Sequence, residues 1–287
     1  MQFEIPQTMK AVNITEPGEV EVLKLLEVPV PEPEPGEILV KVAAAGVNRA
    51  DIILRQPNIP LPVKNKPQVP GLEISGEVVG LGSGVDQFAI GDRVCGLTPG
   101  GGGYAEYVRL PAALAWPVPQ SLSDYQAAAL PEALLTVWNA LFTAPVLRAG
   151  ESLLVHGGVS GIGSIAIKLA QALGINGRLF ATAGNEEKCR VLAGWGVDRA
   201  INYREEDFVE VVRSETQGQG TDVILDMVGG DYLSRNIDAV AIKGRIVQIG
   251  MMRGIRGEVS IPLLMAKRVS LIGASIFFQN VEQKAVL

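Results

Sequence analysis

The chain has 287 residues, of which 47% are hydrophobic and 20% charged, and its net charge at neutral pH is −6. This composition excludes a disordered chain, and the absence of a long basic block argues against nucleic acid as the main partner. No apolar run is long enough to span a membrane, and the start has neither the basic flank nor the apolar core of a signal peptide. We therefore expect a cytoplasmic protein with no membrane partner.

Short apolar or alternating runs in the first third of the chain predict β-strands. They lie at residues 9–14, 37–42, 74–81, 92–95 and 104–108. Gly and Pro separate these runs closely, which indicates many turns. The pattern predicts a partly open β barrel, which we place at residues 1–124.

The pattern changes near Ser123, where Ala- and Leu-rich helices are expected at 125–130 and 132–142. From Glu151 onward, strands and helices alternate. The strands are expected at 152–155, 179–182, 200–202, 223–226, 245–249 and 269–275, and the clearest helices at 162–173 and 186–195. Such alternation predicts an α/β domain, a doubly wound parallel sheet with helices on both faces, over residues 125–275.

A glycine-rich turn, residues 156–163, follows the first of these strands and leads into a helix. Its glycines depart from the G-x-G-x-x-G spacing, so its place between strand and helix carries the interpretation. The small side chains let a pyrophosphate approach the backbone, and the positive end of the helix favours an anion. We predict a dinucleotide site here, with a plain βα turn as the alternative. The residues assigned to the pyrophosphate are Gly158, Ser160, Gly161, Ile162 and Gly163.

The residues after the second strand of this domain distinguish NADPH from NADH. NAD sites usually have a carboxylate there, and this chain continues with Ala183-Gly184-Asn185. Lys188 lies one helical turn further, where an ammonium group can meet a 2′-phosphate. Tyr203 follows the third strand and can donate its hydroxyl to the same phosphate. We therefore expect NADPH, bound at this end by Ala183, Gly184, Lys188 and Tyr203.

Six further stretches spread over the chain carry a family resemblance. They are Ala45-Gly46-Val47-Asn48-Arg49-Ala50-Asp51, Pro70-Gly71-Leu72-Glu73, Gly91-Asp92-Arg93-Val94, Gly103-Tyr104-Ala105-Glu106-Tyr107, Leu130-Pro131-Glu132-Ala133 and Asn202-Tyr203-Arg204-Glu205-Glu206-Asp207-Phe208. With the glycine turn, they resemble the quinone oxidoreductases of the medium-chain dehydrogenase/reductase superfamily, in the zeta-crystallin-like branch. The resemblance implies a GroES-like barrel joined to a Rossmann domain, with the active site in the cleft between them. It also implies hydride transfer from NADPH to a quinone or to an α,β-unsaturated carbonyl, whereas a non-catalytic NADPH-binding protein remains a third reading.

The resemblance also implies roles for three side chains. It places Asn48 near the nicotinamide ribose or the substrate carbonyl, with Asp51 beside it in a polar cluster. It places the Thr136 hydroxyl near the nicotinamide carboxamide. The alternatives are structural: Asn48 and Asp51 are also good caps for a helix at 49–54, and a Thr inside a helix can bond its own backbone.

Two further cofactor contacts are expected near the end of the second domain. Ile249 and Gly250 end a strand at the ligand-bearing edge of the sheet, where Gly permits close backbone approach. Phe277 stands beside Phe278 and is a candidate to stack on cofactor or substrate. The alternatives are an ordinary strand end and ordinary packing.

Zinc is excluded by the residue types at the metal positions of the superfamily. Its alcohol dehydrogenases have Cys where this chain has Asn48 and His where it has Leu72, so only Glu73 of that set remains. One His and two isolated Cys cannot assemble a zinc site. The single His156 is expected to orient the backbone or line the cofactor cleft rather than to act as a catalytic acid.

The resemblance has two departures. Residues 56–62 lack the Tyr that lines the substrate site in relatives, so that contact is not carried over. Relatives also continue for a few dozen residues beyond Leu287, so we expect 276–287 to return to an incomplete barrel domain. The last strand, 269–275, is apolar on both faces, and we expect it to pair with its twin in a homodimer.

Overall fold

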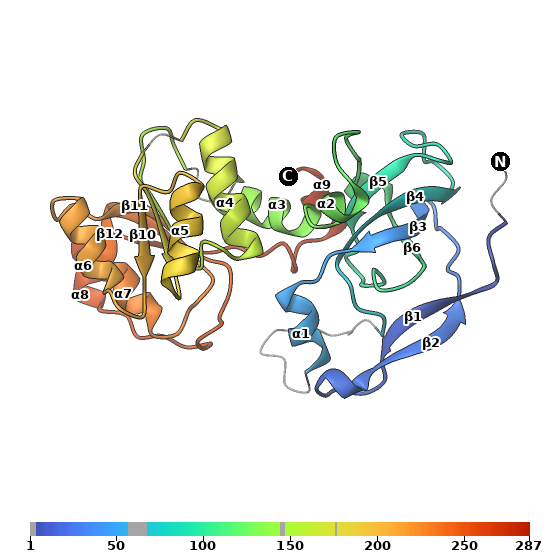
Figure 1. The fold of residues 1–287 in the computed structure, drawn as a ribbon, viewed down its shortest axis with the longest axis horizontal. Helices are drawn as coiled ribbons and strands as arrows, with labels where there is room; N and C mark the ends of the chain where they lie inside the picture. Colours follow the sequence, from blue (N-terminus) through green and yellow to red (C-terminus); the bar gives the residue numbers. More distant parts are fainter. Residues whose placement is uncertain (1–3, 57–67, 144–146, 176) are drawn as a thin grey trace. The chain divides into compact units, whose positions relative to one another are not determined.

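The computed structural model describes residues 4–56, 68–143, 147–175 and 177–287. The chain divides into two compact units (Figure 1). The first unit is Met1–Glu132 with Gln279–Val286, and the second is Ala133–Phe278 with Leu287. The domain boundary at residue 124 that we expect from the sequence stays a prediction.

The first unit contains a five-stranded antiparallel sheet in the order β6-β3-β4-β5-β7. Its strands are β3 (Glu37–Ala45), β4 (Glu73–Leu81), β5 (Arg93–Leu97), β6 (Tyr107–Pro111) and β7 (Ala115–Pro117). The inward side chains form one core that includes Ile38, Val40, Ile74, Val94 and Leu110, all of them fully buried. Its short helices are α1 (Arg49–Arg55), α2 (Asp124–Ala128) and α9 (Val281–Ala285), with 3₁₀ turns η1 (Val20–Val22) and η2 (Ala112–Leu114).

A separate hairpin precedes this sheet. Strands β1 (Thr8–Ile14) and β2 (Leu23–Pro29) pair antiparallel from Thr8 with Pro29 to Ile14 with Leu23. An isolated bridge between Ala11 and Ala105 and a hydrogen bond from the N–H of Ile14 to the carbonyl oxygen of Gln68 at 2.7 Å connect the hairpin to the rest of the unit. The hairpin forms a two-stranded sheet separate from the five-stranded one.

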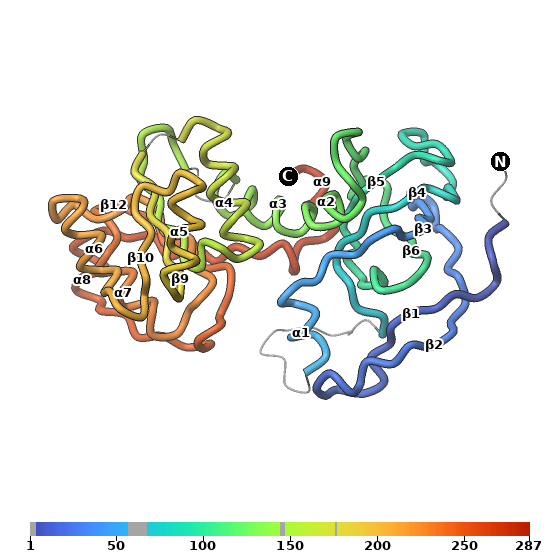
Figure 2. Tube along the Cα trace, viewed as in Figure 1, coloured from blue at the N-terminus to red at the C-terminus, as the bar shows by residue number. Residues whose placement is uncertain are grey.

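The second unit contains a six-stranded parallel sheet in the order β10-β9-β8-β11-β12-β13, of which β9, β10 and β12 are labelled along the tube in Figure 2. Its strands are β8 (Leu153–Val155), β9 (Leu179–Ala183), β10 (Arg199–Asn202), β11 (Thr221–Asp226), β12 (Val240–Gln248) and β13 (Ser270–Gly273). In chain order this is 3-2-1-4-5-6, so the direction of winding reverses between β8 and β11, which is where such sheets bind dinucleotides.

Helices cover both faces of this sheet. They are α3 (Pro131–Trp138) with the π-helical turn η3 (Asn139–Thr143), α4 (Gly161–Ala172), α5 (Glu186–Gly194), α6 (Phe208–Glu215), α7 (Tyr232–Ala239) and α8 (Ile261–Lys267). Alternate residues of one strand serve opposite cores: Leu153 and Val155 pack with α4 and α5, whereas Leu154 packs with α6 and α7. This is the period-2 pattern of a strand buried on both sides.

The predicted fold class, a GroES-like β domain with a Rossmann parallel sheet, is confirmed. Local assignments differ in places. The strand expected at 104–108 begins at Tyr107, and the helix expected at 132–142 ends as an α-helix at Trp138. Strand β2 was not predicted: its sequence, LKLLEVP, does not alternate strictly between apolar and polar residues, and most of its residues are exposed, Leu25 and Leu26 among them.

Within the parts of the chain that the structure describes, we find no helix with the length and apolar character needed to cross a membrane.

The start of α4 yields a stability prediction. A methyl group on Gly163 would lie 2.7 Å from the carbonyl oxygen of Gly158 and closer still to that of Gly157, and both are backbone atoms that cannot move aside. We expect Gly163→Ala to lower the free energy of unfolding by about 1–3 kcal/mol, the usual cost of overpacking. The matched control is Gly161→Ala, since a methyl group there meets no described atom within 4 Å. Thermal or denaturant unfolding of both variants tests this, and equal stability would contradict it.

Candidate active site

The glycine turn joins β8 to α4 and leaves two backbone donors open. Ser160 caps the helix, its Oγ accepting from the N–H of Gly163 at 3.0 Å. The N–H groups of Gly161 and Ile162 have no hydrogen-bond partner among the described residues. Gly161 is also exposed. The turn therefore presents two free donors at the positive end of a helix, which is an anion-binding arrangement.

Gly158 keeps this turn close to the sheet. A methyl group at this position would lie 2.8 Å from Cβ of Ala181 on β9 and 2.8 Å from Leu192 of α5. Its N–H donates to the carbonyl oxygen of Thr182 at 2.9 Å. The turn is thus fixed to the neighbouring strand by its backbone.

The ends of β9 and β10 bring three of the predicted NADPH residues together. The N–H of Tyr203 donates to the carbonyl oxygen of Ala183 at 3.0 Å. A methyl group on Gly184 would lie 2.8 Å from the Tyr203 hydroxyl oxygen, so that hydroxyl lies directly over Gly184. Lys188 is in the first turn of α5, where its N–H donates to Oδ1 of Asn185 at 2.9 Å, and the residue is exposed.

Four other predicted residues of the second unit lie at different places. Ile249 and Gly250 follow β12 beside the end of β11: the N–H of Ile249 donates to the carbonyl oxygen of Asp226 at 2.8 Å. Thr136 is half-buried on α3. The ring of Phe277 meets that of Phe278 edge to face, with 5.4 Å between the centroids. The observed partner of Phe277 is therefore its neighbour.

His156 lies at the centre of a buried polar chain. Its Nε2 is 2.8 Å from Oδ1 of Asn236, and its Nδ1 is 3.3 Å from Oγ1 of Thr182. Asn236 Nδ2 donates to Oδ2 of Asp226 at 2.9 Å, and Thr182 Oγ1 accepts from the N–H of Gly157 at 3.0 Å. The chain therefore connects the glycine turn, β9, α7 and the end of β11.

The chain of donors and acceptors determines the protonation of this histidine. Asn236 must present its oxygen to His156, because its nitrogen donates to Asp226, so Nε2 carries the proton. His156 is fully buried, with its ring edge to face against Phe208 and Tyr232, and burial lowers its pKa. A neutral, inaccessible imidazole fits the predicted structural role.

The first unit holds the other predicted residues, Asn48 and Asp51, at the start of α1. They form a capping box in which Asp51 Oδ2 accepts from the N–H of Asn48 at 2.9 Å. Asp51 also accepts from the Tyr104 hydroxyl at 2.8 Å and from the N–H of Gly71 at 3.0 Å. Burial, reinforced by the hydrogen bond to Asp51, raises the pKa of Tyr104, so its phenol stays protonated at neutral pH. Both residues therefore cap the helix, and they also belong to a polar cluster.

Glu73 completes this cluster. One carboxylate oxygen, Oε1, accepts from Asn48 Nδ2, and the other, Oε2, accepts from the N–H of Glu132, both at 2.8 Å. The side chain is buried, with 3% of its surface exposed. Burial raises the pKa of Glu73, opposed by these two hydrogen bonds.

From the sequence, Glu73 was identified only as a matching residue and as the one left of the metal set, Tyr104 only as a matching residue, and neither was assigned a role in the site. The available signal was that each belongs to a glycine-containing stretch that carried the resemblance. Two other expectations from the sequence concern the metal position and the missing Tyr. Leu72, at the former metal position, is buried, and the described residues contain no group of three His, Cys, Asp or Glu that could hold a metal ion. The missing Tyr concerned 56–62, of which 57–62 lie outside the described residues.

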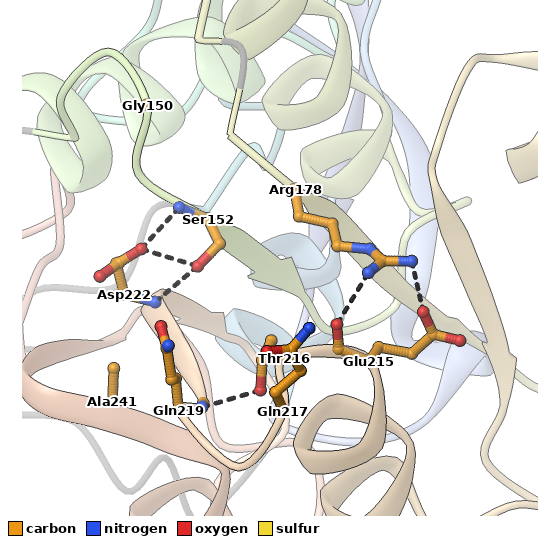
Figure 3. Close-up of a pocket in the computed structure, with 10 residues that line it drawn as sticks. Gly150, Ser152, Arg178, Glu215, Thr216, Gln217, Gln219, Asp222 and Ala241 are labelled. Atoms are coloured by element: carbon orange, nitrogen blue, oxygen red, sulfur yellow. Dashed lines mark hydrogen bonds and ion pairs between the residues drawn. The ribbon is translucent and has the colours of Figure 1, made fainter.

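A pocket of about 370 Å³ lies at the opposite edge of the parallel sheet, near the amino ends of its strands (Figure 3). Its polar groups are paired with each other: Ser152 bonds Asp222 through both its N–H and its hydroxyl, and Arg178 pairs with Glu215. Ligands of such sheets bind at the carboxyl ends, so this pocket is not the cofactor site.

Comparison with known proteins agrees with this architecture. Residues 34–120 match the alcohol dehydrogenase GroES-like domain, and residues 161–286 match the zinc-binding dehydrogenase family. Quinone oxidoreductase of Rattus norvegicus is 33% identical over 96% of this chain and 82% of its own length. A Pseudomonas syringae quinone oxidoreductase structure superposes with a TM-score of 0.85 at 30% identity, covering 97% of this chain and 83% of its own.

A second similar solved structure is named for a different activity, that of an enoyl reductase. The CurK enoyl reductase superposes with a TM-score of 0.83 at 26% identity, covering 97% of this chain and 82% of its own. With a GroES-like domain, a Rossmann sheet and relatives of this similarity, the chain belongs to the medium-chain dehydrogenase/reductase superfamily of oxidoreductases, with quinone oxidoreductases among its relatives.

Proposed function

We propose that this chain is a zinc-independent NADPH:quinone oxidoreductase. The observation that carries the proposal is the turn before α4, with the free N–H groups of Gly161 and Ile162 at an exposed helix start. The family indicates a nicotinamide cofactor, and the relatives named quinone oxidoreductase support the acceptor class.

The residues of the second unit fit a dinucleotide. A side chain at Gly161 would occupy space that is open among the described residues and that a pyrophosphate needs. Gly158, Ser160 and Gly163 hold the turn so that its donors face outward. Ile249 and Gly250 offer close backbone approach beside β11, and Thr136 and Phe277 are proposed to contact the nicotinamide part. When bound, the reduced nicotinamide supplies the hydride.

The preference for NADPH rests on the ends of β9 and β10. Ala183 and Gly184 place no carboxylate there to repel a 2′-phosphate. The Tyr203 hydroxyl lies over Gly184, and the exposed Lys188 follows on the first turn of α5. We propose that both side chains bind this phosphate.

On the acceptor side, we propose that Asn48 donates a hydrogen bond to the oxygen that gains charge as the hydride arrives. The Asp51 carboxylate accepts a hydrogen bond from the backbone N–H of Asn48. It accepts two more, from the Tyr104 hydroxyl and from the N–H of Gly71. Solvent then protonates the reduced quinone. Zinc has no role in this scheme, because Asn48 and Leu72 replace the metal ligands of the resembling alcohol dehydrogenases.

A second candidate function is the reduction of α,β-unsaturated carbonyl compounds, favoured by the similarity to an enoyl reductase structure. It uses the same cofactor site and differs in the shape of the acceptor and in the need for a proton at carbon.

A panel of acceptors tests the activity. We expect NADPH oxidation, followed by its absorbance at 340 nm, to be fastest with an ortho-quinone and slower with an enal and a crotonyl thioester. Prior treatment with a strong chelator should leave the rate unchanged, and loss of activity would overturn zinc independence. Faster turnover of the thioester would favour the second function, and tight NADPH binding with no turnover of any acceptor would favour a non-catalytic binding protein.

Cofactor choice is tested by two variants with different signatures. Lys188→Ala should weaken NADPH binding about tenfold, because a hydrogen bond to a charged group contributes about 1.5 kcal/mol, and leave NADH binding unchanged. Gly161→Ala is the matched control: it crowds the pyrophosphate, so it should weaken both cofactors alike. The dissociation constants of NADPH and NADH, measured by their fluorescence, test both expectations. An equal loss of affinity for both cofactors in Lys188→Ala would refute the 2′-phosphate role.

We also propose a homodimer through β13. This strand is at the edge of the sheet, where its only described neighbour is β12, and most of its residues are exposed. Unpaired edges of this kind promote pairing with another chain. Sedimentation at micromolar concentration should give a dimer, and Leu271→Arg should shift it towards monomer. A wild-type monomer would contradict the proposal.

A further inference from the structure

The amide group of Asn48 lies between two neighbours of opposite hydrogen-bonding character. Its Nδ2 donates to Oε1 of Glu73 at 2.8 Å. In the capping box, the same side chain faces the backbone N–H of Asp51, which donates to the carbonyl oxygen of Asn48 at 3.1 Å. A carboxylate only accepts, so turning the amide over would place its oxygen against that of Glu73. The orientation of Asn48 is therefore fixed, and one hydrogen of Nδ2 remains unused by these contacts.

Glu73 is itself held in one position. Its second oxygen, Oε2, accepts from the N–H of Glu132 in the first turn of α3, where a negative charge is favoured. A methyl group at Gly46 would lie 2.5 Å from the carboxylate carbon of Glu73, so the glycine makes room for this side chain. The carboxylate is thus fixed between the start of α3 and Asn48.

We propose that Glu73 is a positioning residue for the reaction. It holds the amide of Asn48 so that the second hydrogen of Nδ2 is presented to the oxygen of the acceptor. The inference rests on the proposed function, in which Asn48 is the donor. It assigns to Glu73 a role distinct from metal binding.

The requirement is for a carboxylate rather than for any polar group of the same size. Glutamine has one acceptor oxygen and one donor nitrogen in its amide. It can accept from Glu132 or from Asn48, but its nitrogen must then face the other donor. Glu73→Gln therefore preserves the shape of the side chain and removes one of the two contacts.

A double-mutant cycle tests the proposal. Glu73→Gln should lower kcat at least about tenfold, as expected when a charge-stabilising donor is displaced. The NADPH dissociation constant should change less than about threefold, because the pyrophosphate and 2′-phosphate contacts are elsewhere. In the Asn48→Ala background, the same substitution should leave kcat unchanged, because Glu73 acts through Asn48. Glu77→Gln, on the same strand, is the matched control and should behave as wild type.

Two results would overturn the proposal: a wild-type kcat in Glu73→Gln, or an equal fall of kcat when Asn48 is already alanine. Thermal unfolding of each variant separates these effects from loss of structure. If Glu73→Gln does not fold, Glu73→Asp replaces it in the same cycle, because the shorter side chain cannot reach both donors. Its effect on kcat must likewise disappear in the Asn48→Ala background.

A spectroscopic readout distinguishes failure of this inference from failure of the proposed function. In ¹⁵N-correlated NMR spectra without cofactor, Asn48→Ala identifies the side-chain NH₂ pair of Asn48. The hydrogen bonded to Glu73 should resonate at high chemical shift in the wild type and lose that shift in Glu73→Gln. An unchanged pair refutes the positioning role. A shifted pair in a protein that reduces no acceptor upholds the positioning and refutes only the activity.

Discussion

The close packing of Gly163 against the carbonyl groups of Gly157 and Gly158 is the contact on which the carboxyl edge of the second unit depends. It brings the start of α4 onto the end of β8, where Gly161 is exposed and the N–H groups of Gly161 and Ile162 have no partner among the described residues. The strand order places β11 on one side of β8 and β9 on the other. The glycine turn, the Tyr203–Gly184 contact and the Ile249–Gly250 segment therefore lie along one edge of one sheet.

The buried series of hydrogen bonds through His156 connects the elements at this edge, and the histidine in it is neutral. Between the N–H of Gly157, which donates, and the carboxylate of Asp226, which accepts, each side chain of the series both donates and accepts. Buried polar groups stabilise a structure only when all of them are satisfied, and here aromatic rings exclude water around the imidazole. A second polar cluster, around Asp51 and Glu73, orders the first unit by the same principle, with two carboxylates in place of the imidazole.

The parallel sheet and the glycine turn were predictable because strand burial and βα alternation leave a strong apolar pattern, as in β8 and β9. Exposed strands and the ends of helices were less predictable. Strand β2 is exposed on most of its length, and the π-helical end of α3 continues the same Ala- and Leu-rich pattern as the helix before it. For the candidate site, Gly161 was proposed from the local turn and Asn48 from the family resemblance, whereas the partner of Asn48 lies 25 residues away on β4. Pairing across a sheet depends on register, which no local pattern specifies.

Gly46 constrains how the first unit could be redesigned. Any side chain at this position would occupy the space of the Glu73 carboxylate, so the two positions cannot be varied independently. A side chain at residue 46 requires the Glu73 carboxylate to move from its place between Asn48 and Glu132, whereas a shorter residue at 73 opens space for a larger group at 46. The pair therefore defines the order in which substitutions near Asn48 become accessible to engineering.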